Sequence, residues 1–190
     1  MRQIICFGDS LTAGWDGQKE TRKLTERLEK LLRCAVINAG VPGETTRQAL
    51  QRFDSDVMQP NKDAVTILFG SNDASFHKGI PIREFEENLL TIGERLAPIP
   101  FLLITPPPVI ERLQIGKRKN TIITEYASVV RQVATRLHAP FVDFHQIMAA
   151  QPDRSRLLQA DGLHLSDSGY NLLAQLISDS VKNIIKSENE

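Results

Sequence analysis

The stretch Ile4-Ile5-Cys6-Phe7-Gly8-Asp9-Ser10, in which a short apolar run enters a glycine turn, decides how the chain is expected to fold. Continuous apolar runs of this length are typical of strands buried on both faces of a parallel sheet. Ligands of open α/β sheets bind at the carboxyl ends of the strands, where Ser10 would lie. Gly-Asp-Ser is also an ordinary strand-terminating turn, so this stretch alone is consistent with a nucleophilic serine or with a turn serine.

Strand-like and helix-like patterns alternate from end to end, which predicts a three-layer α/β/α fold around a five-stranded parallel sheet. The expected strands are Gln3 to Phe7, Ala35 to Asn38, Ala64 to Phe69, Phe101 to Thr105 and Phe141 to Asp143. The expected helices are Thr21 to Arg33, Ile82 to Leu96, Asn120 to His138 and Ser168 to Lys186. Ser166 is the expected N-cap of the last helix. No repeat or long linker interrupts the pattern, so residues 1–190 are expected to form a single domain.

The charge of the chain is balanced, with 23 Lys and Arg against 23 Asp and Glu. This balance argues against nucleic acid or an anionic membrane as a partner. The short basic cluster Lys117-Arg118-Lys119 is expected to be the solvated start of a helix. No apolar stretch approaches the ~20 residues of a membrane span, and the first apolar run is too short for a signal peptide. We therefore expect a cytoplasmic protein, of undetermined oligomeric state, that acts on a small molecule.

Neither a metal nor another cofactor is expected. The two cysteines, Cys6 and Cys34, are not spaced as metal ligands and are interpreted as reduced and structural. The chain has no cluster of His, Cys and carboxylates with metal-ligand spacing and no glycine-rich phosphate loop.

Partners that could activate Ser10 occur near the C-terminus, in Asp161-Gly162-Leu163-His164. An aspartate and a histidine three residues apart in a polar turn can face one point, where the Asp holds one imidazole nitrogen and the other accepts the serine proton. Asp167 is the competing carboxylate, but it has the position of an acidic first-turn residue of the last helix.

The other three histidines have different expected roles. His138 ends a predicted helix, where a cation is favoured by the helix dipole. His145 follows the fifth predicted strand as a surface or core residue, and His77 could line the entrance of the site.

Two further glycine turns follow predicted strands, at residues 38–43 and 69–73. Each can aim a hydrogen-bond donor at the negative charge that develops on a carbonyl oxygen during acyl transfer. Asp9, by contrast, is expected to bond backbone amides within its turn and to take no part in the chemistry.

Four blocks of the chain, in order, resemble those of the SGNH (GDSL) hydrolases: Ser10 in Gly-Asp-Ser, the glycine of the second turn, Asn72 in Gly70-Ser71-Asn72-Asp73, and His164 in Asp161-Gly162-Leu163-His164. The resemblance runs from residue 4 to about the end of the last helix. Residues 69–74, 104–108 and 161–166 are most similar to the isoamyl acetate-hydrolysing esterases. The resemblance implies a flavodoxin-like strand order.

The resemblance also implies roles for these residues. Ser10 would be the nucleophile, His164 the general base and then acid, and Asp161 the residue that orients it. The oxyanion hole would comprise the backbone N–H groups of Ser10 and Gly43 and the side-chain amide of Asn72. Gly40 is the rival glycine; Gly43 is preferred because the family's glycine follows an Asn by five positions, as Gly43 follows Asn38.

Candidate pocket residues are Trp15, Ser71 and Pro106. Trp15 lies just beyond the nucleophile turn and is equally consistent with a packing tryptophan. Thr105-Pro106-Pro107-Pro108 is expected to form a stiff rim of the pocket. The predicted function is a serine esterase that forms an acyl-enzyme and acts on short, acetyl esters of small alcohols. The alternatives are a carbohydrate O-deacetylase, a lysophospholipase or thioesterase, and a catalytically silent binder, for which a broken triad would be expected.

Overall fold

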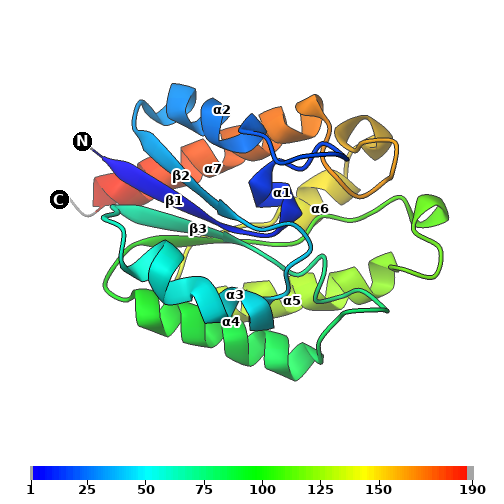
Figure 1. Ribbon diagram of the computed structural model, residues 1–190, viewed down its shortest axis with the longest axis horizontal. Coiled ribbons are helices and arrows are strands. Elements are labelled where there is room, and N and C mark those ends of the chain that lie inside the picture. The colour runs from blue at the N-terminus through cyan, green and yellow to red at the C-terminus, as the bar shows by residue number, and fades with distance from the viewer. Residues whose placement is uncertain (1, 188–190) are drawn as a thin grey trace.

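A computed structural model describes residues 2–187, so residues 1 and 188–190 of the predicted domain lie outside the described part of the chain. Its centre is a five-stranded parallel sheet of order β2-β1-β3-β4-β5 (Figure 1). The strands are β1 Gln3–Gly8, β2 Ala35–Gly40, β3 Ala64–Leu68, β4 Phe101–Ile104 and β5 Phe141–Val142. Both the predicted α/β class and the flavodoxin-like strand order are confirmed.

Helices cover both faces of the sheet (Figure 1). One face carries α3 Thr46–Phe53, α4 Ile82–Leu96 and α5 Asn120–Arg136, and the other carries α1 Ser10–Ala13, α2 Lys23–Leu32, α6 Phe144–Ala149 and α7 Asp167–Ser187. Shorter turns are the π-helical η1 Asp54–Met58 and the 3₁₀ turns η2 Glu111–Leu113 and η3 Arg154–Leu157. None of the helices within residues 2–187 is long and apolar enough to cross a bilayer.

The side chains of β1 show why its apolar run is continuous. Ile5 and Phe7 pack into the core under α3, α4 and α5, whereas Ile4 and Cys6 pack into the core under α2 and α7. All four are fully buried. Burial raises the pKa of the Cys6 thiol to about 12, which keeps it an inert core group.

The helices that the sequence pattern missed are α1, α3 and α6. The sequence of α3 is mostly polar and buries only Thr46, Ala49 and Phe53, so its apolar stripe is too sparse to be recognised. A capping box between Thr45 and Gln48 begins this helix. The predicted N-cap of α7 is confirmed, because Ser166 Oγ accepts a hydrogen bond from the N–H of Gly169 at 3.2 Å.

Candidate active site

Ser10 is the first residue of α1, directly after β1. Asp9 caps this helix, with its Oδ1 accepting the N–H of Leu11 at 2.9 Å. The turn has no room for a side chain at Gly8, since a Cβ there would lie 2.1 Å from Thr12 Oγ1 and 2.6 Å from Leu68 O. This tight connection holds the Ser10 hydroxyl at the carboxyl edge of the sheet.

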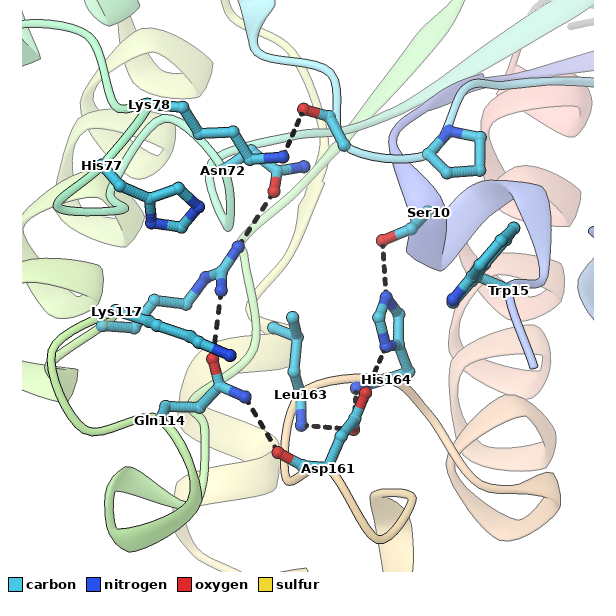
Figure 2. A pocket seen from close by; sticks show the side chains of 13 residues that line it. Ser10, Trp15, Asn72, His77, Lys78, Gln114, Lys117, Asp161, Leu163 and His164 are labelled. Atoms are coloured by element: carbon cyan, nitrogen blue, oxygen red, sulfur yellow. Dashed lines mark hydrogen bonds and ion pairs between the residues drawn. The ribbon is translucent and has the colours of Figure 1, made fainter. Parts of the chain in front are cut away.

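The structure brings Ser10, His164 and Asp161 into contact (Figure 2). His164 Nε2 lies 3.1 Å from Ser10 Oγ, and His164 Nδ1 lies 2.5 Å from Asp161 Oδ2. The other carboxylate oxygen of Asp161 accepts the N–H groups of Leu163 at 2.9 Å and His164 at 3.0 Å. Partial burial alone would raise the pKa of Asp161, but the hydrogen bonds from His164 and the two backbone amides lower it to about 2. Asp161 is therefore a carboxylate at neutral pH.

The rival carboxylate, Asp167, lies elsewhere. It is the acidic first-turn residue of α7 that the sequence predicts, and it pairs with Arg27 at 3.1 Å and Lys23 at 3.6 Å on α2. It therefore belongs to an exposed contact between two helices.

Gln159, which the sequence analysis did not identify, ties the His164 loop to the Ser10 loop. Its Nε2 donates to the carbonyl groups of Trp15 and Leu165, both at 2.9 Å, and its N–H donates to the His164 carbonyl at 2.7 Å. The register of His164 relative to Ser10 is thus set by a side chain outside both motifs.

Gly40 is the last residue of β2 and Gly43 lies in the turn that follows it. Of these two glycines, only Gly43 lines the pocket. Gly40 instead packs on α1, where a Cβ would lie 2.2 Å from the backbone N of Ala13, and its own N–H donates to Asn38 Oδ1 at 3.0 Å. Gly43 has φ 81°, a conformation that favours glycine. Within residues 2–187, neither Gly43 N–H nor Ser10 N–H donates a hydrogen bond to the protein, which leaves both free for a ligand.

Asn72 is buried in the floor of the pocket. Its Nδ2 donates to Glu44 O at 2.9 Å and to Asp9 Oδ2 at 3.3 Å. The sequence predicted that Asp9 bonds only backbone amides. Its second carboxylate oxygen also accepts a hydrogen bond from the Asn72 side chain. Burial raises the pKa of Asp9 to about 7.

Arg118 corrects the interpretation of the basic cluster at 117–119. It is not solvated but only 5% exposed, and its guanidinium donates to Asn72 Oδ1 at 2.9 Å, Ser71 O at 2.8 Å and Gln114 Oε1 at 3.0 Å. Gln114 Nε2 in turn donates to Asp161 O at 2.8 Å. The reason is that the segment after β4 turns through η2 and returns to the sheet edge before α5 begins. The only signal in the sequence was the position of these charges after a predicted strand.

The pocket has a volume of about 400 Å³. The structure places these predicted residues in its lining: Ser10, Trp15, Gly43, Asn72, His77, Asp161 and His164. The other lining residues were not predicted from the sequence: Pro42, Lys78, Gln114, Lys117, Arg118 and Leu163. Among the residues that the structure describes, no group of three or more His, Cys, Asp or Glu side chains could hold a metal ion.

The expectation that Ser71 and Pro106 face the pocket is wrong. Ser71 is 3% exposed, with its carbonyl bound to Arg118. Pro106 lies against Gly70, and its carbonyl oxygen lies 3.1 Å from Nδ1 of the buried His145. Residues 105–109 are buried and none of them lines the pocket, so they do not form its rim.

Comparisons with known proteins relate the whole chain to one group of hydrolases. A model of the GDSL-like lipase/acylhydrolase family matches residues 6–172. The isoamyl acetate-hydrolyzing esterase 1 homologs of Bos taurus and Homo sapiens are 32% and 31% identical, over 88% and 90% of this chain and 76% and 77% of theirs. An acetylxylan esterase of Geobacillus stearothermophilus is 26% identical over 74% of this chain and 68% of its own. The crystal structure of a lipase/acylhydrolase from Enterococcus faecalis matches with a TM-score of 0.92 and 36% identity, over 96% of both chains.

Proposed function

This chain belongs to the GDSL-like lipase/acylhydrolase family, and we propose that this carboxylic ester hydrolase cleaves short acyl esters of small alcohols through an acyl-enzyme on Ser10. The observation that carries the proposal is the continuous contact from Ser10 Oγ through the His164 ring to the Asp161 carboxylate. This arrangement activates a hydroxyl that is otherwise a weak nucleophile.

In the first half of the reaction, Ser10 Oγ attacks the ester carbonyl carbon and its proton passes to His164 Nε2. Asp161 accepts a hydrogen bond from the Nδ1–H group, without taking its proton, and stabilises the imidazolium that results. When the tetrahedral intermediate collapses, His164 returns the proton to the leaving alkoxide, and the alcohol departs. Water then attacks the acyl group on Ser10 by the same proton transfers, which releases the acid and restores the enzyme.

Three hydrogen-bond donors would stabilise the negative charge that develops on the carbonyl oxygen: the N–H groups of Ser10 and Gly43 and the side-chain amide of Asn72. Because Arg118 donates to Asn72 Oδ1, the amide nitrogen is directed away from Arg118, toward Glu44 and Asp9. Of its two hydrogen bonds, the one to Asp9 is the longer, at 3.3 Å, so this hydrogen is the one that an oxyanion would attract.

The size and lining of the pocket support a small acyl group. Its apolar lining consists of Trp15, Pro42 and Leu163, which is little surface for a fatty chain. A carbohydrate O-deacetylase is the second candidate, because an acetylxylan esterase is among the similar proteins and the acetyl group would be the same.

The test is the hydrolysis of 4-nitrophenyl acetate by Ser10→Ala, for which we expect kcat to fall by roughly a million-fold, toward the background rate. The wild-type enzyme, quenched during turnover, should carry a single acetyl group on the peptide that contains Ser10. Ser178→Ala, which removes a buried hydroxyl in α7, is the matched control and should retain wild-type turnover. Near-normal hydrolysis by Ser10→Ala would contradict the proposal.

A further inference from the structure

One side of the pocket is cationic. Figure 2 shows His77, Lys78 and Lys117 across the pocket from Ser10 and His164. They come from two separate segments, the loop after β3 and the loop between η2 and α5. Because the formal net charge of the whole chain is zero, the charges of Lys78 and Lys117 are a local feature and do not belong to a generally basic protein.

The acidic groups near the cationic side of the pocket already have other hydrogen-bonding or ion-pair partners. Asp161 bonds to His164, and Asp9 is buried beneath the pocket against Asn72. Glu44 pairs with Arg52 at 2.7 Å. None of these carboxylates pairs with either lysine.

Neither of the two lysine ammonium groups forms an ion pair with a described residue. Lys78 Nζ donates to Gly43 O at 3.0 Å, and no other hydrogen bond or ion pair of this ammonium group occurs within residues 2–187. The Lys117 ammonium group makes none with any described residue, although the Lys117 backbone is held by hydrogen bonds to Gln114 and Phe76. Partial burial, and then the charge of Arg118, lower the pKa of Lys78, so an anion beside it would relieve an unfavourable charge.

We propose that the ester substrate carries a carboxylate or a phosphate group, which binds between Lys78 and Lys117 while the ester carbonyl lies at Ser10. This inference rests on the proposed function, and it narrows the substrate class from neutral esters to anionic ones. Ammonium groups suit both anions, since each acts as a compact charge with several donors. Charge-assisted hydrogen bonds in a partly desolvated pocket are also stronger than those between neutral groups.

The experiment compares esters that differ only in charge. On the alcohol side, 4-acetoxybenzoate is matched with the neutral 4-acetoxybenzamide, and 4-acetoxyphenyl phosphate tests the phosphate. On the acyl side, monoethyl succinate is matched with ethyl succinamate. In at least one of the two matched pairs, we expect kcat/KM for the anionic ester to exceed that for the neutral ester by about tenfold. This ratio should decrease as the salt concentration is raised.

Variants test which residues cause the preference for anionic esters. Lys117→Met should bring the anionic-to-neutral ratio of kcat/KM close to one, and it is the cleaner variant because Lys78 also holds the Gly43 carbonyl. Lys182→Met, at an exposed position in α7, is the matched control and should keep the ratio. If hydrolysis depends on Ser10 but shows no preference for an anionic ester, this inference is wrong and the proposed function still stands. The same conclusion follows if the preference survives in both Lys78→Met and Lys117→Met. If Ser10→Ala leaves hydrolysis of all these esters unchanged, the proposed function fails and this inference fails with it.

Discussion

The two walls of the active site are built differently. The wall of Ser10 and His164 comes from two short motifs, and its Asp161–His164 contact joins residues three apart in the chain. The wall of Asn72 comes from several loops and is held by Arg118, whose hydrogen bonds reach residues 46 and 47 positions away. Within the first wall, the Asp161–His164 pair is therefore encoded by local spacing, although its contact with Ser10 spans 154 positions. The second wall depends on how a long loop folds back onto the sheet.

After substitution of the nucleophile itself, the largest expected effect also belongs to the first wall. Asp161→Asn keeps the size of the side chain but removes the charge that stabilises the imidazolium, so kcat for 4-nitrophenyl acetate should fall on the order of 1000-fold. Asp167→Asn is its matched control, because that residue only pairs with Lys23 and Arg27 at the surface. The control should keep kcat within about twofold and lose at most about 1 kcal/mol of stability. The reverse order of effects would show that the local motif was misassigned.

The same contrast decides how much could be predicted from the sequence. The strands were predictable because buried parallel strands contain continuous apolar runs, such as Ile4 to Phe7 in β1. Ser10, Asp161 and His164 could be predicted as a set because they lie in two short motifs, Gly8-Asp9-Ser10 and Asp161-Gly162-Leu163-His164, that resemble those of the GDSL hydrolases. Arg118 could not, because a basic run is usually solvated and only the tertiary fold of the segment before α5 buries it.

Two errors have the same origin. Ser71 and Pro106 were expected in the pocket because they follow strands at the correct edge of the sheet. However, position along the chain does not say which side of a loop faces the ligand. Ser71 is buried, and its carbonyl accepts a hydrogen bond from Arg118. Gln159 was missed because nothing in its local sequence indicates that its side chain reaches Trp15, 144 residues away.

Asp9 joins the two walls, since its two oxygens accept from Leu11 and Asn72. Burial raises its folded-state pKa to about 7 from the ordinary value of 3.8. Between these two values the unfolded chain releases the proton while the folded protein keeps it, so the free energy of unfolding should fall as pH rises from about 4 to about 7. The decrease attributable to Asp9 is expected to be on the order of a few kcal/mol.

Urea unfolding at a series of pH values measures this decrease. Asp9→Asn, which cannot ionise, should flatten the profile in this window. An Asp9→Asn profile as steep as that of the wild type would mean that another group is responsible, and that the two walls are not linked by a carboxyl group of raised pKa.

The smallest expected effect concerns the second wall alone. Asn72→Ala should lower kcat by roughly 100-fold with little change in KM, because an oxyanion donor acts mainly in the transition state. Arg118→Met should lower kcat by about tenfold, since it removes the group that fixes the direction of the Asn72 amide. If Arg118 acts through Asn72, its substitution should cost nothing more once Asn72 is absent.

A double-mutant cycle on 4-nitrophenyl acetate therefore separates positioning from general stabilisation. The double variant should match Asn72→Ala in kcat, and Arg118→Lys, which keeps the charge but loses the planar fork, should recover only part of the loss. Lys119→Met, at the exposed neighbouring position, controls for charge and should retain wild-type kcat. Independent, multiplicative losses in kcat would mean that Arg118 supports this wall by some route other than Asn72. The second wall would then be less connected than its hydrogen bonds indicate.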